Sequence, residues 1–160
     1  MSFLLPGGPI PLFDKLDQRA APTGHEAGQG LSADGVEASV ECELQRLLNS
    51  RSRIGLYGFT QANLTVCDYG IPDYTALSAR SESDRVQIAA AIAYAIQHFE
   101  PRLHNVTVTP WGAANGITIA LFQIDGDLPI ANTVRRVRFT LAAETPPAEI
   151  ISSKPAEVIA

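Results

Sequence analysis

The stretch HFEPRLHNVTV, residues 98–108, marks the point where the chain changes from one pattern to another. Before it, residues 82–99 carry apolar side chains at helical spacing, and after it residues 103–111 alternate as a strand does. Between the two lies Glu100-Pro101-Arg102. Pro101 predicts the end of the helix, because the residue before a proline is disfavoured in the helical conformation. The stretch therefore predicts a helix-to-strand corner.

Glu100 is an unexpected residue for the end of a helix. The peptide dipoles leave partial negative charge there, so an acid costs about 0.3–1 kcal/mol. Two interpretations fit the residues. Glu100 and Arg102 form an ion pair within the chain, or the stiff corner presents both charges to a partner. The residues alone favour the first, because most such charges are solvated or paired at the surface.

Two helices are predicted before the corner. The first covers residues 34–49, with Ser32 as its N-cap, and its apolar residues lie at helical spacing. The second covers residues 82–99, where Ser81 and Asp84 have the spacing of a capping box. Its isoleucines and many alanines predict burial on several sides. The segment 54–80 between the helices is predicted to be mainly loop. The apolar stripe of the first helix comprises Val36, Val40, Leu44, Leu47 and Leu48.

Three strands are predicted after the second helix, at residues 103–111, 116–124 and 133–141. Residues 112–115 suit a hairpin link, and DGDLP (125–129) predicts a longer turn. Alternation on the last strand puts Arg136 and Arg138 on one face, opposite an apolar face. The fold class is therefore α+β, with two main helices packed on one face of a small antiparallel three-stranded meander.

Composition limits the possible functions of the chain. Its 160 residues carry a net charge of −5 with no cluster of lysines and arginines, which argues against nucleic-acid binding. The two cysteines, Cys42 and Cys67, predict reduced thiols rather than a disulfide framework, as in a cytoplasmic protein. The N-terminus has no pattern of a signal peptide, and no apolar run has the length of a membrane span.

Motifs for catalysis or cofactor binding are missing from the sequence: we find no Gly-rich phosphate loop, HExxH, CxxC or GxSxG. His98 and His104 flank Glu100, but their spacing does not enforce a metal site. Glu100 with Asp68 or Asp73 is a conceivable glycosidase pair, although nothing in the sequence brings these acids together. We therefore expect no enzyme activity, no cofactor, no metal and no small-molecule substrate.

Four motifs, taken in order and spacing, give a resemblance. PLFDKL (11–16), ECELQRLLNSR (41–51), YGIPD (69–73) and FEPRL (99–103) resemble the TssE family, the baseplate wedge components of the type VI secretion system. That family is similar to the sheath-initiating wedge protein of contractile phage tails. The resemblance runs from about residue 11 to residue 142. It implies a small α+β domain, and no catalytic pair supports the "lysozyme-like" label that the family has carried.

The resemblance also implies partners. Glu100, Pro101 and Arg102 would contact the helical core bundle of other wedge proteins, so that a partner supplies the donor for Glu100. An exposed edge of the meander would pair with sheath subunits. Arg136 and Arg138 are further candidates for partner binding, although with Arg135 they would blunt the edge if theirs is the edge strand. The alternatives are a muramidase-like cell-wall hydrolase and an adaptor-binding regulator on the same domain.

The resemblance divides the chain into three parts. Residues 34–142 form the baseplate wedge domain. Residues 1–33 are expected to be a flexible segment with a short helix over 11–18, where Leu12, Phe13 and Leu16 share a face. Residues 143–160, which are rich in proline, are expected to be a flexible tail.

Overall fold

The computed structural model describes residues 32–111, 120–130 and 132–143, together with the backbone of residues 149–159. The predicted short helix at 11–18 and the hairpin link at 112–115 lie outside these residues. The elements in chain order are α2 (Ala33–Asn49), α3 (Leu56–Phe59), the 3₁₀ turn η1 (Val66–Asp68), α4 (Glu82–Phe99), β1 (His104–Pro110), β2 (Ala120–Ile130), β3 (Thr133–Ala143) and β4 (Glu149–Ile159).

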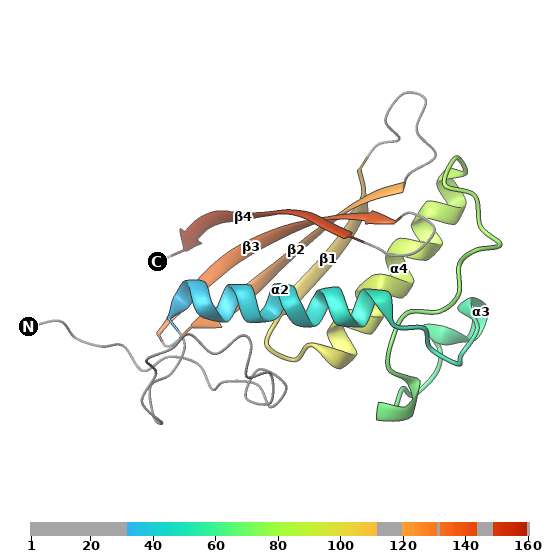
Figure 1. Cartoon of the computed structure of the whole chain (residues 1–160), viewed down its shortest axis with the longest axis horizontal. Coiled ribbons are helices and arrows are strands. Elements are labelled where there is room, and N and C mark those ends of the chain that lie inside the picture. The colour runs from blue at the N-terminus through green and yellow to red at the C-terminus, as the bar shows by residue number, and fades with distance from the viewer. Residues whose placement is uncertain (1–31, 112–119, 131, 144–148, 160) are drawn as a thin grey trace, which may run out of the picture.

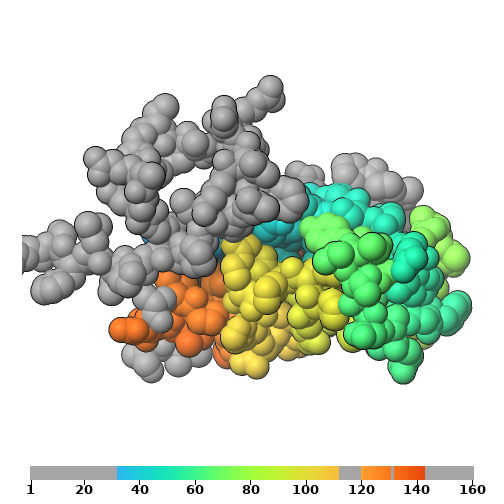
Figure 2. Space-filling model, turned by 90° about the horizontal axis from the view of Figure 1, so that it is seen from below, coloured from blue at the N-terminus to red at the C-terminus, as the bar shows by residue number. Residues whose placement is uncertain are grey.

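The strands form one antiparallel sheet in the order β1-β2-β3-β4, and α2 and α4 pack against one face of it (Figure 1). This confirms the α+β fold class. Seen from below, α4 and β1 lie between the loop region that contains α3 and η1 and the strands that follow (Figure 2). The helix-to-strand corner is thus in the middle of this face of the molecule.

The sheet has a fourth strand that the sequence pattern did not predict. Residues 149–159, expected to be a flexible tail, run antiparallel to β3 along its length. The prolines suggested a tail because proline removes a backbone donor. An edge strand tolerates such a residue, since the N–H it lacks would face outward, and Pro155 pairs with Val137 in the register of this edge strand.

Both long helices begin and end close to the predicted residues. The Ser32 hydroxyl accepts from the Gly35 N–H, and the Ser81 hydroxyl accepts from the Asp84 N–H. The Asp84 carboxylate accepts from the Ser78 N–H, so it extends the cap into the preceding turn. No helix among the described residues is both long and apolar enough to cross a membrane. The buried apolar residues of these helices include Val36, Val40, Leu44, Leu47, Leu48, Ile88, Ile92 and Ile96.

The DGDLP segment, predicted as a turn, is part of β2. Asp125 and Asp127 lie on the outer face of the sheet, where Arg138 and Arg136 of the neighbouring strand β3 pair with them. Gly126, between them, faces the helices, and a Cβ there would lie 2.7 Å from the Leu103 Cγ. The turn prediction was wrong because the glycine makes room for Leu103 and the aspartates serve in cross-strand ion pairs.

We predict that Gly126→Ala destabilises the domain, because the new methyl group would overlap the buried Leu103 side chain. Overpacking of a core typically costs about 1–3 kcal/mol. Urea unfolding should show this loss in the free energy of unfolding. Gly58→Ala is the matched control, since a Cβ there meets only the Ile54 Cγ2 at 3.9 Å. Equal stability of the two variants would contradict the packing argument.

Candidate functional site

Backbone hydrogen bonds alone define the turn at the helix-to-strand corner. Glu100 is the C-cap of α4, and its N–H donates to the Ile96 carbonyl at 2.8 Å. The Leu103 N–H donates back to the Glu100 carbonyl at 3.1 Å. Pro101 is exposed at the outside of the turn, whereas Leu103 is buried. The corner is therefore a tight turn with one apolar anchor.

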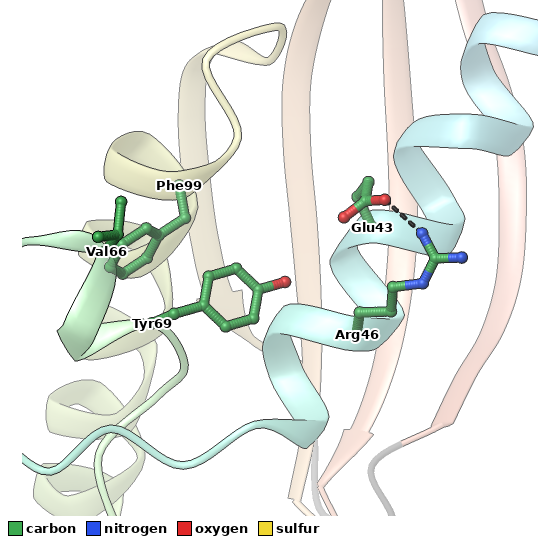
Figure 3. A pocket seen from close by; sticks show the side chains of 5 residues that line it. All are labelled: Glu43, Arg46, Val66, Tyr69 and Phe99. Atoms are coloured by element: carbon green, nitrogen blue, oxygen red, sulfur yellow. Dashed lines mark hydrogen bonds and ion pairs between the residues drawn. The ribbon is translucent and has the colours of Figure 1, made fainter. Parts of the chain in front are cut away.

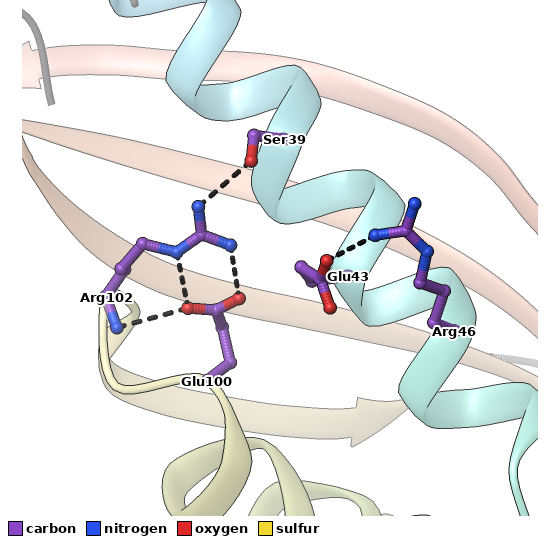
Figure 4. Close-up of polar contacts among 5 residues, drawn as sticks. All are labelled: Ser39, Glu43, Arg46, Glu100 and Arg102. Carbon is purple, nitrogen blue, oxygen red and sulfur yellow. Dashed lines mark hydrogen bonds and ion pairs between the residues drawn. The ribbon is translucent and has the colours of Figure 1, made fainter. Parts of the chain in front are cut away.

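Glu100 and Arg102 form a bidentate ion pair within the chain (Figure 4). Arg102 Nε donates to Glu100 Oε1 at 2.8 Å, and Nη2 donates to Oε2 at 2.7 Å. The Arg102 N–H also donates to Oε1. Glu100 is only 4% exposed, so the carboxylate is held entirely by its own chain. Within the isolated chain Arg102 donates to both carboxylate oxygens, so Glu100 has a donor without a partner. That a partner also donates to Glu100 stays a prediction.

The same guanidinium ties the corner to α2. Arg102 Nη1 donates to the Ser39 hydroxyl at 3.0 Å, and Glu43 lies one turn further along the same side of α2 (Figure 4). A bidentate pair fixes the plane of a guanidinium, which a single charge contact does not. The corner and α2 are therefore held in one orientation, and the cost of the acid at the helix end is offset by Arg102.

The end of α2 is braced by the loop that carries the YGIPD motif. The Ile71 N–H donates to the Ser50 carbonyl at 3.0 Å, and the Ser52 N–H donates to the Ile71 carbonyl at 2.9 Å. Gly70 has a φ of +115°, and a Cβ there would lie 2.7 Å from the Ser50 carbonyl carbon. Only glycine fits this approach. Two of the motifs that carry the resemblance are thus in direct contact.

Asp68 organises the turn η1 next to this brace. Its carboxylate accepts from Arg53 Nε at 2.7 Å and from both the hydroxyl and the N–H of Thr65. The hydrogen bonds from Arg53 and Thr65 lower the pKa of Asp68 to about 2. A carboxyl that is so strongly ionised cannot hold the proton that a general acid must donate.

A pocket of about 480 Å³ lies between α2, η1 and the end of α4 (Figure 3). Val66, Tyr69 and Phe99 give it an apolar wall, and the ion pair of Arg46 with Glu43 lies on α2 opposite. The Tyr69 ring meets Phe99 edge to face with its hydroxyl directed toward α2. Burial, with the charge of Glu43, raises the pKa of Tyr69. The pocket adjoins the corner, since Phe99 precedes Glu100.

Arg136 and Arg138 lie elsewhere, on the outer face of the sheet. Their side chains are 50% and 47% exposed, and their Nε atoms pair with Asp127 and Asp125 at 3.1 Å and 2.6 Å. Hydrogen bonding, first from Asn105 and then from Arg136, lowers the pKa of Asp127. Because β3 lies between β2 and β4, these arginines do not blunt an edge. The structure does not bring them together with the Glu100 corner.

Arg135, on the other face of β3, has a different role. It pairs with Asp34 at 2.7 Å and with Glu37 at 3.2 Å, both in the first part of α2. The hydrogen bond to Asp34 raises the pKa of Arg135. These contacts hold the start of α2 against the sheet, as Arg102 holds its middle.

The candidate metal and glycosidase residues have structural partners. A His98 ring nitrogen lies 2.7 Å from the Leu64 carbonyl oxygen, and His104 is exposed at the start of β1. The residues that the structure describes contain no group of three potential metal ligands. Asp73 accepts from the Thr75 N–H, which lowers its pKa. Glu100 is paired with Arg102, and Asp68 is paired with Arg53. These contacts argue against a catalytic carboxylate pair.

The comparisons with known proteins place these features in a family. The model of the family described as baseplate wedge protein gp25 matches residues 34–133. The chain belongs to this family. Comparisons with curated proteins and with solved structures gave no match. The matched range of this baseplate wedge protein contains nearly all of α2, the braced loop, the pocket, the corner and β2, whereas most of β3 with Arg135, Arg136 and Arg138 lies outside it.

Several residues of the site could not be identified from the sequence. In the sequence Ser39 is an ordinary helix residue, and only the fold brings Arg102 to its hydroxyl. Glu43 and Arg46 have the spacing of a surface pair on a helix, and only the fold places Tyr69 beside them to form the pocket. Val66 had no signal in the sequence, because its 87% exposure is visible only in the fold. Free thiols were predicted for Cys42 and Cys67, and both are free and exposed.

We predict that Arg102→Ala destabilises the isolated protein, because it leaves the buried Glu100 carboxylate without its donors. An unsatisfied buried acceptor costs about 1–3 kcal/mol, and more when it is charged. Urea unfolding measures this directly. The double variant Glu100→Leu/Arg102→Leu should lose less than Arg102→Ala, since it buries no unpaired charge. Wild-type stability of Arg102→Ala would show that the pair contributes nothing to the fold.

The depressed pKa of Asp68 predicts a specific loss of stability in acid. Its pKa in the folded state, about 2, is below the ordinary value of 3.8. The contribution is therefore complete above the ordinary value and is lost as the pH falls from about 4 toward 2. The difference in unfolding free energy between wild type and Asp68→Asn should shrink over this range. A difference that stays constant with pH would contradict the assignment.

Proposed function

We propose that this chain is a structural baseplate component of a type VI secretion system, a contractile injection machine, and works in the cytoplasm without enzymatic activity. In this role it docks to other wedge proteins and initiates the sheath. The observation that carries the proposal is the family match over residues 34–133, which includes every motif of the resemblance except PLFDKL. Asp68, a candidate acid of the competing hydrolase, has a lowered pKa, and the residues that the structure describes contain no group of three potential metal ligands.

The corner is the proposed docking surface for the wedge partners. Its three residues have separate tasks in this proposal. Glu100 is buried and positions the guanidinium, Pro101 is exposed and stiffens the turn, and the partly exposed Arg102 meets the partner. A surface that is already rigid loses little conformational entropy on binding, which favours affinity. A partner helix would thus contact a preformed ridge rather than an unpaired carboxylate.

The proposed contact with sheath subunits is an edge of the sheet, and β4 is the better candidate. β1 has only seven residues, an irregular register between His104 and Thr107, and an Asn105 φ of 50°. β4 has eleven residues and, in the described part of the chain, pairs only with β3. A long unpaired edge accepts another strand through main-chain hydrogen bonds. Arg136 and Arg138, exposed on the neighbouring strand, would contact the incoming subunit.

Co-expression with the wedge and sheath proteins of the same genome tests this function. The wild-type chain should co-purify with the wedge proteins, and a deletion strain should assemble no sheath. Pro101→Tyr should abolish co-purification with little change in melting temperature, because it blocks the exposed ridge and leaves the ion pair intact. Gln61→Tyr, at another exposed position, is the matched control. Normal assembly with Pro101→Tyr would exclude the corner as the docking surface.

A further inference from the structure

The pocket beside the corner has the character of a binding site for apolar side chains. Val66 is 87% exposed and Tyr69 is 36% exposed, and both line the pocket together with Phe99 at the end of α4. Exposed apolar residues that gather in a hollow, rather than singly, mark a place where something binds. Its volume of about 480 Å³ is enough for two large side chains, and the polar pair Glu43 and Arg46 borders it on one side.

The chain itself carries a segment with matching chemistry. PLFDKLDQ (11–18) is an apolar island among glycines and prolines, and its Leu12, Phe13 and Leu16 have the spacing of one helical face. It also carries Asp14, Lys15 and Asp17, so both signs of charge are present. Glu43 and Arg46 form an ion pair at the border of the pocket, and each could gain a further opposite charge from the segment.

The length of the chain between the island and α2 permits this contact. The 13 residues from 19 to 31 can span up to about 45 Å when extended. Glu43 lies 11 residues along α2 from Ser32, which corresponds to about 17 Å of helix. The tether is longer than the distance along α2 by more than a factor of two. A tether of this length would give an effective concentration in the millimolar range, so even a weak apolar contact would be populated.

We propose that residues 11–18 of this chain bind in the pocket formed by Val66, Tyr69, Phe99, Glu43 and Arg46. Phe13 and Leu16 fill the apolar side against Phe99 and Val66. The bound segment lies beside the corner, so it covers part of the surface next to Pro101 and Arg102. It is thus a built-in competitor for any partner that reaches from the corner into the pocket. The proposal does not depend on the identity of that partner.

The test uses the full-length chain and its own thiol. Cys67 is exposed next to Val66, so its reaction rate with a small disulfide reagent reports cover over the pocket, in a Cys42→Ser background. Phe13→Ser/Leu16→Ser should raise this rate several-fold and shift the amide resonances of Val66, Tyr69 and Phe99. Leu4→Ser/Leu5→Ser is the matched control, since it removes two apolar residues outside the island.

Each outcome decides the proposal. Faster reaction and shifted resonances in the island variant alone, in a protein that sedimentation shows to be a monomer, support it. Identical rates and spectra for wild type, island variant and control overturn it and leave the pocket to a partner. The same changes accompanied by the loss of a dimer also overturn it, because the occupant is then a second copy.

Discussion

The arrangement of this protein depends on one ion pair in which the acid is almost completely buried. Glu100 ends α4 where the helix dipole disfavours it, and Arg102 compensates from two residues further on through both carboxylate oxygens. Because the same guanidinium reaches Ser39, the pair fixes how α4, β1 and α2 meet. A buried ion pair is seldom the most stable solution, and an apolar replacement is often as good. Its value is geometric, since it defines one orientation where apolar packing alone would allow several.

The other polar contacts extend this constraint outward. Arg135 holds the start of α2 to β3, and Gly70 lets the loop approach the end of α2 closely enough for two backbone hydrogen bonds. Asp68 then fixes the turn that presents Val66 and Tyr69. Except for the contact of Asp68 with Thr65, each of these contacts joins segments that are distant in sequence. Together they explain why three separated motifs, at 41–51, 69–73 and 99–103, have to occur in one chain for the corner and its pocket to form.

The sequence predicted what depends on local pattern. Both helices, their caps and the apolar face of β3 follow from spacing alone, and the structure has them close to the expected residues. The predictions failed where a tertiary contact overrides local preference. DGDLP has turn composition, but Leu103 needs Gly126 and the outer arginines need Asp125 and Asp127. The proline-rich end looked like a tail because composition does not show that β3 has an open edge for it to pair with.

The functional site also shows that local sequence pattern does not reveal tertiary contacts. Glu100 and Arg102 were recognised as a pair of interest, but the sequence does not distinguish a charge offered to a partner from a charge used internally. The structure assigns the acid to the inside and leaves the proline and the outer part of the guanidinium at the surface. The corner leads into β1 at one edge of the sheet, whereas β4 is the opposite edge, with two strands between them. Under the proposed function, two partners would therefore bind at the same time, one at the corner and one along β4, without competing for surface. The hydrogen-bonded strands β1 to β4 connect the two places, so the domain would hold both neighbours in a fixed relation.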